Sequence, residues 1–302
     1  MYLNQIVNSA KSKIPKINVK GICFDSRKIK NKDVFFAING KNTSGINYLD
    51  QVIKKGAVAI IAEDKIKFFN YKVPIIYVKN IRKSLSRACS NFYKKKPRNI
   101  IAVTGTNGKT SVVSFFNQIL NHNKINSASI GTLGINSKKI KIKTKLTSMD
   151  PIFLHKNLKI LKEKNIEIVI LEASSHGLDQ NRLDYIKFKT GIFTNLSHEH
   201  LDYHKNFKNY LNSKMYLFKK LLNKKSNIIT DSGNKEYKIL KKISLTKKIK
   251  INTIGIKKND LKVLNYEFLD QAQLLKILYN KKIYKVKVPL IGSLQIKNIM
   301  MS

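Results

Sequence analysis

The sequence predicts an α/β fold in which a small N-terminal α/β domain precedes a larger domain with a mostly parallel sheet. The first observation is a β-branched run at 100–103 that leads into Gly105, Gly108 and then a helical pattern. The second is a set of short β-branched segments, bounded by turn residues, along the rest of the chain. The third is length, because 302 residues are enough for two domains with their own cores. We expect the domains to be 1–80 and 81–302.

The N-terminal domain is expected to alternate strands with helices. Its predicted strands are 19–24, 34–38, 57–62 and 73–78, and its predicted helix is 48–55. A further helix at 82–93 and a polar stretch at 94–99 lead to the second domain. The Asp25-Ser26-Arg27 segment could equally be a turn at a strand end with a surface ion pair.

The second domain continues the alternation. Its further predicted strands are 127–133, 166–171, 191–196, 228–229, 251–256, 274–279 and 283–288. A helix should begin at Pro151 with Asp150 as its N-cap, another should span 206–222, and a third should begin near 292. The basic stretches 137–145 and 241–250 are expected to be surface turns and hairpin edges.

The Gly-Lys-Thr between strand and helix predicts a phosphate-binding loop. Backbone N–H groups and the helix dipole would face the anion, Lys109 would reach the outer phosphates, and Thr110 would hold a Mg²⁺ ion. The strict pattern requires glycine where this chain has Val103, so the loop is a variant. The alternative is an ordinary turn between a strand and a helix.

Glu172 is the candidate metal ligand of this loop. It follows the apolar run 166–171, and the carboxyl end of a buried parallel strand is where α/β sheets place ligand-binding groups. Phosphate-binding loops need such a partner for Mg²⁺. The alternative is a glutamate that caps a helix or forms a salt bridge.

Three histidines lie within seven residues at 198–204 and suggest a second metal site. The segment comes close to the His-x-His-x-Asp-His ligand set of metallo-β-lactamase-type hydrolases, but Tyr203 stands in place of the last histidine. Those enzymes carry no phosphate-binding loop.

Lys214, among apolar neighbours in a predicted helix, would by itself be a snorkelling surface residue.

The formal charge of +41 does not by itself indicate a nucleic-acid-binding protein. Lysines spread over the whole chain, whereas nucleic-acid binding favours basic residues gathered on one element and interleaved with aromatics. Cys23 and Cys89 have no spacing typical of a disulfide framework or a zinc site. No apolar run could span a bilayer, and the N-terminus does not resemble a signal peptide. We expect a cytoplasmic, monomeric protein without nucleic-acid partners or membrane insertion.

Taken in order, these segments resemble the Mur ligases. The matching stretches are Asp25-Ser26-Arg27, the loop 105–110, the block 171–178, Gln180-Asn181-Arg182, 194–197 and 200–204. The Ser-Ser-His-Gly-Leu block beside Gln180 and Arg182 is typical of the branch that extends the peptidoglycan dipeptide precursor.

The resemblance implies an ATP-dependent ligase of peptidoglycan precursor synthesis. It would join a third amino acid, meso-diaminopimelate or L-lysine, to UDP-MurNAc-L-Ala-D-Glu through an acyl phosphate. The implied cofactors are Mg²⁺ ions and a carbamylated lysine at Lys214. One Mg²⁺ would be held by Thr110 and Glu172, and the second by His200. The Lys214 carbamate would support either the second metal or the γ-phosphate.

The resemblance also implies the binding residues. Those for ATP are Gly105, Thr106, Asn107, Gly108, Lys109, Thr110, Ser111 and Asn298. Those for the uridine nucleotide are Phe24, Ser26, Lys41, Asn42 and Thr43. Those for the muramoyl-peptide are Thr147, Ser148, Ser174, Gln180 and Arg182. Arg27 and Arg182 persist in a chain that otherwise uses lysine, and an arginine fork can bind two oxygens at once.

Some positions depart from the family pattern. Leu146, Ser148 and Gln295 replace the usual polar or amide residues, and 42–45 replaces an Asp-Gly turn. The family's third, C-terminal domain, which binds the incoming amino acid, is not found in the sequence. We therefore expect binding of ATP and the UDP substrate with little or no ligation by this chain alone. The alternatives are a metal-dependent hydrolase built on 198–204 and a basic nucleic-acid-binding protein with a phosphate-binding loop.

Overall fold

The computed structural model describes residues 1–9, 13–40, 43–63, 72–144, 146–255 and 260–302. Contacts divide the chain into two compact units. Unit 1 consists of Met1–Lys96, Asp150–Ile160 and Gln180–Tyr185. Unit 2 consists of Pro97–Met149, Leu161–Asp179 and Ile186–Ser302. The predicted domain boundary near residue 80 stays a prediction.

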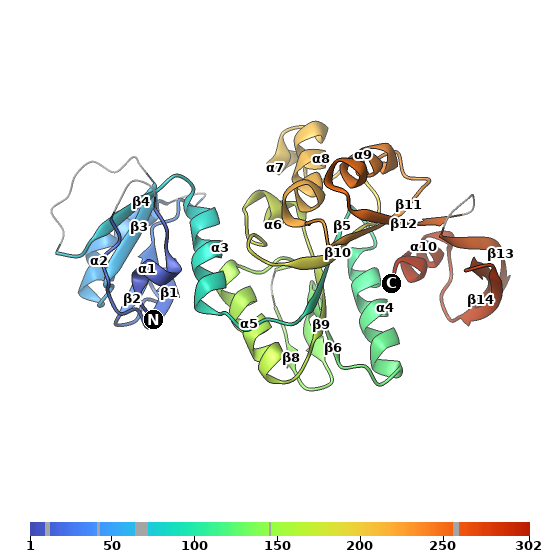
Figure 1. Cartoon of the computed structure of the whole chain (residues 1–302), viewed down its shortest axis with the longest axis horizontal. Coiled ribbons are helices and arrows are strands. Elements are labelled where there is room, and N and C mark those ends of the chain that lie inside the picture. The colour runs from blue at the N-terminus through green and yellow to red at the C-terminus, as the bar shows by residue number, and fades with distance from the viewer. Residues whose placement is uncertain (10–12, 41–42, 64–71, 145, 256–259) are drawn as a thin grey trace. The chain divides into compact units, whose positions relative to one another are not determined.

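Unit 1 contains a parallel sheet of four strands in the order β1-β2-β3-β4 (Figure 1). The strands are β1 (Gly21–Cys23), β2 (Asp33–Phe36), β3 (Ala59–Glu63) and β4 (Ile75–Val78). Its helices are α1 (Leu3–Ile6), η1 (Gly45–Tyr48), α2 (Leu49–Lys54) and α3 (Ile81–Phe92). The residues of β2 are buried on both faces, where they pack into two apolar clusters. A continuous apolar strand of this kind is typical of a sheet covered on both sides.

Unit 2 is built on an eleven-stranded sheet with the order β15-β14-β13-β12-β11-β10-β5-β9-β6-β7-β8. The parallel strands are β5 (Asn99–Thr104), β6 (Ser127–Gly131), β9 (Ile168–Glu172), β10 (Phe188–Phe193), β11 (Asn227–Asp231) and β12 (Lys250–Gly255). Strands at both edges pair antiparallel: β7 (Gly134–Ser137), β8 (Lys141–Ile142), β13 (Leu261–Leu269), β14 (Ala272–Tyr279) and β15 (Lys282–Val288). The predicted α/β class with a mostly parallel sheet is confirmed.

Most of the remaining helices connect these strands, the last one follows the final strand, and the one that begins at Pro151 belongs mostly to unit 1 (Figure 1). They are α4 (Lys109–His122), α5 (Pro151–Glu163), α6 (Ser175–Asp179), α7 (Leu201–His204), α8 (Phe207–Tyr216), the π-helical turn η2 (Leu217–Leu221), α9 (Tyr237–Lys247) and α10 (Ser293–Met301). Helices α4 and α10 pack on the sheet through one apolar cluster that includes Val103, Val112 and Ile296. This cluster fixes the start of α4 against the end of β5, which is where the predicted phosphate-binding loop lies.

Several local predictions are confirmed. The side chain of Asp150 accepts a hydrogen bond from the backbone N–H of Phe153 (2.9 Å), so it caps α5 as expected. The predicted helix 206–222 is α8 followed by η2. The prediction for 241–250 was wrong, because most of this basic stretch belongs to α9, whose Leu240 and Ile243 are buried. Strand β13 and the short helices α6 and α7 were not predicted.

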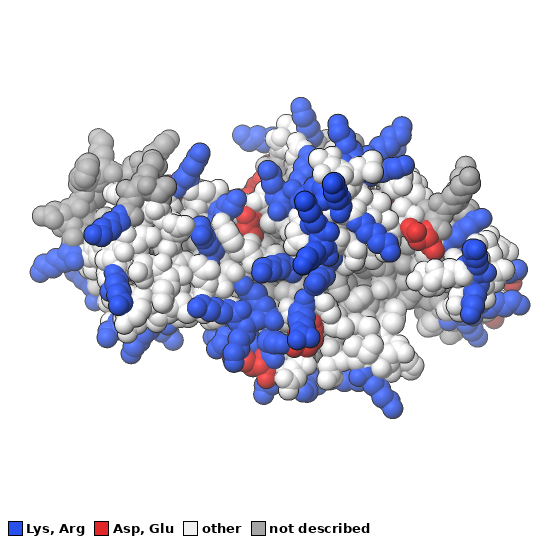
Figure 2. Space-filling view, in the orientation of Figure 1, with Lys and Arg blue, Asp and Glu red and all other residues white. Residues whose placement is uncertain are grey.

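Lysine and arginine side chains are spread over the face that Figure 2 draws, and they are not gathered on one element. Among the described residues, no helix is long and apolar enough to cross a membrane.

Candidate active site

The loop between β5 and α4 requires glycine at two positions. Gly105 has a φ of +150° and Gly108 a φ of +83°, a region that side chains other than glycine rarely adopt. A Cβ atom at Gly105 would lie 1.9 Å from Thr194 Oγ1, and one at Gly108 would lie 2.3 Å from Asn298 Oδ1. The loop therefore passes closely between the segment after β10 and helix α10, which carries Asn298, a residue predicted to bind ATP.

The segment after β10 holds the loop in place. Asn107 N–H donates to Asn195 Oδ1 (2.9 Å), and Thr194 Oγ1 donates to the carbonyl oxygen of Asn107 (2.6 Å). Thr106 N–H donates to the carbonyl oxygen of Asn195 (2.9 Å). These bonds come from a strand adjacent to β5, so the loop conformation is fixed before any ligand binds.

Lys109, the first residue of α4, folds back over the loop. Its Nζ donates to the carbonyl oxygens of Gly105 (3.0 Å) and Thr106 (2.6 Å). Burial lowers the pKa of Lys109, and the nearby carboxylates of Glu172 and Glu199 act in the opposite direction. Its hydrogen-bond partners among the described residues are both neutral carbonyl groups, so the ammonium can turn to an anion in the loop at little loss of bonding.

Glu172 stands at the carboxyl end of β9, beside the loop. Its side chain is buried and accepts three hydrogen bonds, from Thr110 Oγ1 (3.0 Å), Thr132 N–H (2.8 Å) and Thr132 Oγ1 (3.2 Å). No Lys or Arg among the described residues lies within ion-pair distance of this carboxylate. A buried carboxylate beside a hydroxyl fits Mg²⁺, which binds proteins through one or two carboxylates and otherwise uses water and phosphate oxygens.

Lys214, on α8, is one of the most deeply buried side chains of unit 2. It is 1% exposed, its Nζ donates to the carbonyl oxygen of Gly105 (2.7 Å), and it lies 4.4 Å from the centre of the Tyr210 ring. Burial, with a contribution from the charge of Lys109, lowers the pKa of Lys214 to about 7, while Glu199 acts in the opposite direction. The interpretation as a snorkelling surface lysine was wrong, because α8 packs this face against the loop.

Tyr210 connects Lys214, the loop and the histidines. Its hydroxyl lies 3.0 Å from Thr106 Oγ1, and its ring centre lies 5.3 Å from that of His204 and 6.3 Å from that of His200. The ring of His200 also lies 5.1 Å from that of His176, centre to centre. The structure therefore brings His200 and Lys214 to the same side of the loop.

Three residues predicted to bind the muramoyl-peptide gather at Glu172. Ser148 Oγ donates to the carbonyl oxygen of Glu172 (3.1 Å) and accepts a hydrogen bond from Ser174 N–H (2.9 Å). Thr147 Oγ1 lies 3.1 Å from the hydroxyl of Thr132, which itself bonds Glu172. Hydroxyl groups thus surround the end of β9.

Unit 1 has a cavity of about 600 Å³ at the predicted uridine site. Phe24, Ser26 and Thr43 line it, together with Arg27 and Arg82. The predicted residues Lys41 and Asn42 lie outside the described residues.

The guanidinium of Arg27 is already engaged. It binds both carboxylate oxygens of Asp25 (2.9 and 3.0 Å), and this hydrogen bonding lowers the pKa of Asp25. The alternative interpretation of Asp25-Ser26-Arg27, a turn with a surface ion pair, therefore applies to Arg27. Gln180 and Arg182 also group with unit 1, where Arg182 donates to Gln180 Oε1 (2.7 and 3.1 Å) and Arg82 Nη1 lies 3.4 Å from the same oxygen.

Comparison with known families decides the class of protein. A family model described as the Mur ligase middle domain matches residues 103–302, and one described as the Mur ligase family, catalytic domain, matches residues 18–93. The chain belongs to the Mur ligase family. The hydrolase alternative is set aside with this result. Among the described residues, no group of three His, Cys, Asp or Glu side chains is arranged to hold a metal ion by itself.

Two curated relatives of this Mur ligase chain carry the same name. UDP-N-acetylmuramoyl-L-alanyl-D-glutamate–2,6-diaminopimelate ligase of Rickettsia montanensis is 40% identical over 288 residues, which are 94% of this chain and 60% of that protein. The protein of that name from Rickettsia conorii is 39% identical over 289 residues, with the same shares. The Mur ligase chain thus spans about 60% of the length of these relatives.

Solved structures show the same fold. A structure of UDP-N-acetylmuramoyl-L-alanyl-D-glutamate–2,6-diaminopimelate ligase covers 100% of this Mur ligase chain and 62% of its own, with a TM-score of 0.86 and 23% identity. The MurF ligase of Thermotoga maritima in complex with ADP covers 94% of this chain and 61% of its own, with a TM-score of 0.66 and 18% identity.

Within unit 2 of the Mur ligase chain, one sheet edge carries the predicted reaction residues. Thr110 bonds Glu172, and Lys109 and Lys214 both bond the carbonyl oxygen of Gly105 in the loop. The sequence did not single out Tyr210 or Thr132. A tyrosine four residues before Lys214 lies on the same helical face, and a hydroxyl directly follows Gly131 at the end of β6. These two patterns are signals that could have found them.

Proposed function

We propose that this chain carries the nucleotide and UDP-substrate sites of an ATP-dependent amide ligase. The reaction would join 2,6-diaminopimelate, the amino acid that appears in the names of the relatives, to UDP-MurNAc-L-Ala-D-Glu through an acyl phosphate. The observation that carries the proposal is the convergence of Lys109, Glu172 and Lys214 on one loop. The proposal keeps the cytoplasmic location predicted from the sequence.

The reaction brings two anions together, the γ-phosphate of ATP and the carboxylate that it activates. The loop N–H groups and the dipole of α4 would hold the phosphates, and Lys109 would turn from the Gly105 and Thr106 carbonyls to meet them. Thr110 and Glu172 would hold a Mg²⁺ ion, which screens the charge between the two reactants. Asn298 would contact the nucleotide where α10 approaches Gly108.

Lys214 would act as a carbamate. The amine must be neutral to react with CO₂, and the low pKa of Lys214 supplies a neutral amine near pH 7, which an exposed lysine does not. His200 and this carbamate would together hold the second Mg²⁺ ion. Tyr210 would keep the side chain of Lys214 directed at Gly105.

Each unit carries proposed contacts for one part of the UDP substrate. The 600 Å³ cavity with Phe24, Ser26 and Thr43 would take the uridine nucleotide. Thr147, Ser148 and Ser174, which meet at Glu172, would contact the muramoyl-peptide whose carboxylate is activated. Arg182, held by Gln180, would bind two oxygens of the same substrate.

Calorimetric binding of ATP and of UDP-MurNAc-L-Ala-D-Glu to the chain tests the proposal. We expect ATP binding to require Mg²⁺ and UDP-substrate binding to weaken about tenfold in Arg182→Lys, because lysine cannot form the paired contact. Arg98→Lys, which changes an arginine outside the proposed site, is the matched control. Release of ADP that requires both UDP-MurNAc-L-Ala-D-Glu and diaminopimelate would extend the result to turnover, with lysine as the competing amino acid. Absence of Mg²⁺-dependent ATP binding, or equal affinity of Arg182→Lys for the UDP substrate, would refute the proposal.

A further inference from the structure

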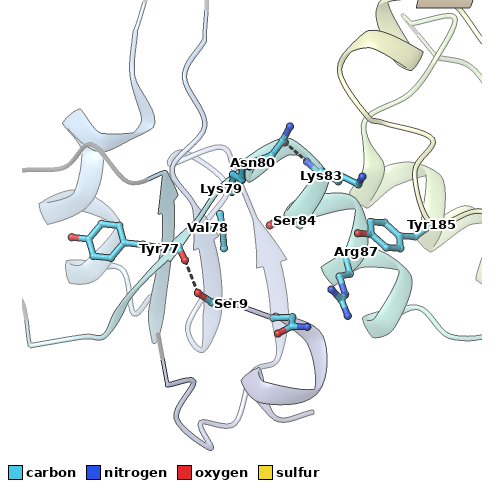
Figure 3. A pocket seen from close by; sticks show the side chains of 10 residues that line it. Ser9, Tyr77, Val78, Lys79, Asn80, Lys83, Ser84, Arg87 and Tyr185 are labelled. Carbon is cyan, nitrogen blue, oxygen red and sulfur yellow. Dashed lines mark hydrogen bonds between the residues drawn. The ribbon is translucent and has the colours of Figure 1, made fainter. Parts of the chain in front are cut away.

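Unit 1 has a second cavity, of about 690 Å³, that none of the proposed substrate contacts uses. It lies where β4 ends and α3 begins, and Ser84, Arg87 and Tyr185 contribute to its lining (Figure 3). The carboxyl ends of parallel strands are where open α/β sheets bind ligands. Its volume is within the range of small-molecule sites, and is much larger than a bare ion needs.

Arg87 is the group that gives this cavity its chemistry. Its guanidinium lies 5.9 Å from the centre of the Tyr185 ring, beside which Figure 3 draws it. It forms no hydrogen bond or ion pair with any residue that the structure describes. The aromatic ring orients the cation without using its N–H donors, so the fork stays available for an oxyanion.

The other polar groups of the lining add to a positive field. Lys79 forms no ion pair with the described residues, and Ser84 carries a hydroxyl that bonds none of them. Lys83 lies 4.0 Å from the buried carboxylate of Asp184, which offsets one charge. The cavity therefore retains positive charge from Lys79 and Arg87.

The helix α3 places two arginines in two different cavities. Arg82 lines the 600 Å³ cavity and Arg87 lines the 690 Å³ cavity. The chain has only five arginines among its 59 basic residues, so both cavities use a residue type that is rare in it. Lysine supplies the same charge without the planar fork, which is the feature that recognises oxyanions in pairs of bonds.

We infer that this second cavity is a binding site for a small metabolite with an oxyanion head, separate from the UDP-substrate site. The head would bind Arg87, with Lys79 and the Ser84 hydroxyl as further contacts. The body would fill the remaining volume along Val78 and Ser9, whose hydroxyl donates to the carbonyl oxygen of Tyr77 (2.7 Å).

The small number of arginines makes a site-resolved test possible. The chain is labelled with ¹⁵N only in arginine, so its NMR spectrum contains five Nε–H signals, each assigned by one Arg→Lys substitution. Inorganic phosphate, glucose 6-phosphate and citrate are titrated separately. We expect the Arg87 signal to shift and saturate, with tighter binding of glucose 6-phosphate or citrate than of inorganic phosphate. Arg98, outside both cavities, is the internal control.

The organic probes also identify the head group. Tighter binding of glucose 6-phosphate indicates a phosphate ester, and tighter binding of citrate indicates a polycarboxylate. In calorimetry, Arg87→Lys should weaken binding of the better probe about tenfold, and Arg98→Lys should not. Unchanged positions of the other four arginine signals in Arg87→Lys verify that the variant is folded.

Two results would overturn the inference. One is an Arg87 signal that moves in proportion to probe concentration without saturating. The Arg98 control signal would behave in this way if the probe changed only the ionic strength. The other is a saturating shift at Arg82 with none at Arg87, which would assign the anion to the UDP-substrate cavity. Neither result bears on ATP binding in unit 2, so it leaves the proposed ligase function untouched.

Discussion

The first turn of α4 and the last turn of α8 each place a lysine against the same carbonyl oxygen. Lys109 Nζ lies 3.0 Å and Lys214 Nζ 2.7 Å from the oxygen of Gly105. Two ammonium groups this close repel each other, and burial removes the water that would screen them. The pKa of Lys214 falls to about 7, partly because of the charge on Lys109.

The difference lies in what else surrounds each lysine. The carboxylate of Glu172 raises the pKa of Lys109 against the effect of burial, and it has no such role at Lys214, which lies against the Tyr210 ring. One lysine is therefore set to stay a cation and the other to become a neutral amine. Two lysines that bond the same carbonyl oxygen thus differ in their tendency to be charged because their neighbours differ.

Replacement of Lys214 should have the largest effect on stability. The pKa falls from 10.5 to about 7 on folding, so the unfolded chain binds more protons between these values and stability rises with pH across that window. At and below pH 7 the full penalty applies, on the order of 5 kcal/mol. Lys214→Met should therefore unfold at higher urea concentration than the wild type at pH 7, in buffer freed of CO₂.

The pH dependence distinguishes this effect from better packing. The advantage of Lys214→Met should shrink as pH rises from 7 towards 10, because the native lysine is then neutral and the free energy needed to deprotonate it falls as pH approaches the unfolded pKa of 10.5. Lys241→Met, an exposed change on α9, is the control and should show no such trend. An advantage that is the same at pH 7 and pH 10 would contradict the lowered pKa.

Replacement of Lys109 tests the contrast between the two lysines through the lysine that stays a cation. Lys109→Ala removes the cation that meets the phosphates, and we expect Mg²⁺-dependent ATP affinity to fall about 10²- to 10³-fold. It also removes a like charge beside Lys214, so the pKa of Lys214 should rise. In the Lys109→Ala background, the stability advantage of Lys214→Met should then begin to decline at a higher pH than in the wild-type background. Lys241→Ala provides the control for a general loss of positive charge, and retained ATP affinity in Lys109→Ala would remove its assigned role.

The core of this site could be predicted from the sequence because its signals are local. The apolar runs of β5 and β9 are continuous, as buried parallel strands require, and each ends directly at the residues that matter. The Gly-Lys-Thr and Glu172 therefore had definite places at the carboxyl edge of a sheet. The family resemblance singled out His200 within the histidine cluster at 198–204, and it added Lys214, whose position no local pattern specifies.

Other features could not be predicted because their causes are distant in the chain. The bond between Tyr210 and Thr106 joins residues 104 positions apart. In β13 only Val263 is buried, so its strand conformation depends on pairing with β14 and leaves no buried alternation to detect. In α9 the many lysines masked a buried stripe of only Leu240, Ile243 and Ser244.

The Tyr210 hydroxyl gives the smallest expected effect and the finest distinction. Tyr210→Phe keeps the ring against Lys214 and removes the hydroxyl with its bond to Thr106, whose Oγ1 still accepts a hydrogen bond from Ser197 N–H (3.0 Å). We expect the free energy of unfolding to fall by about 1 kcal/mol and the pH dependence contributed by Lys214 to remain. Tyr210→Leu also removes the ring, so it should change that pH dependence as well. If Tyr210→Phe alone abolished the pH dependence, the hydroxyl and not the ring would be controlling Lys214, and the two lysines would then be coupled through Thr106 of the loop.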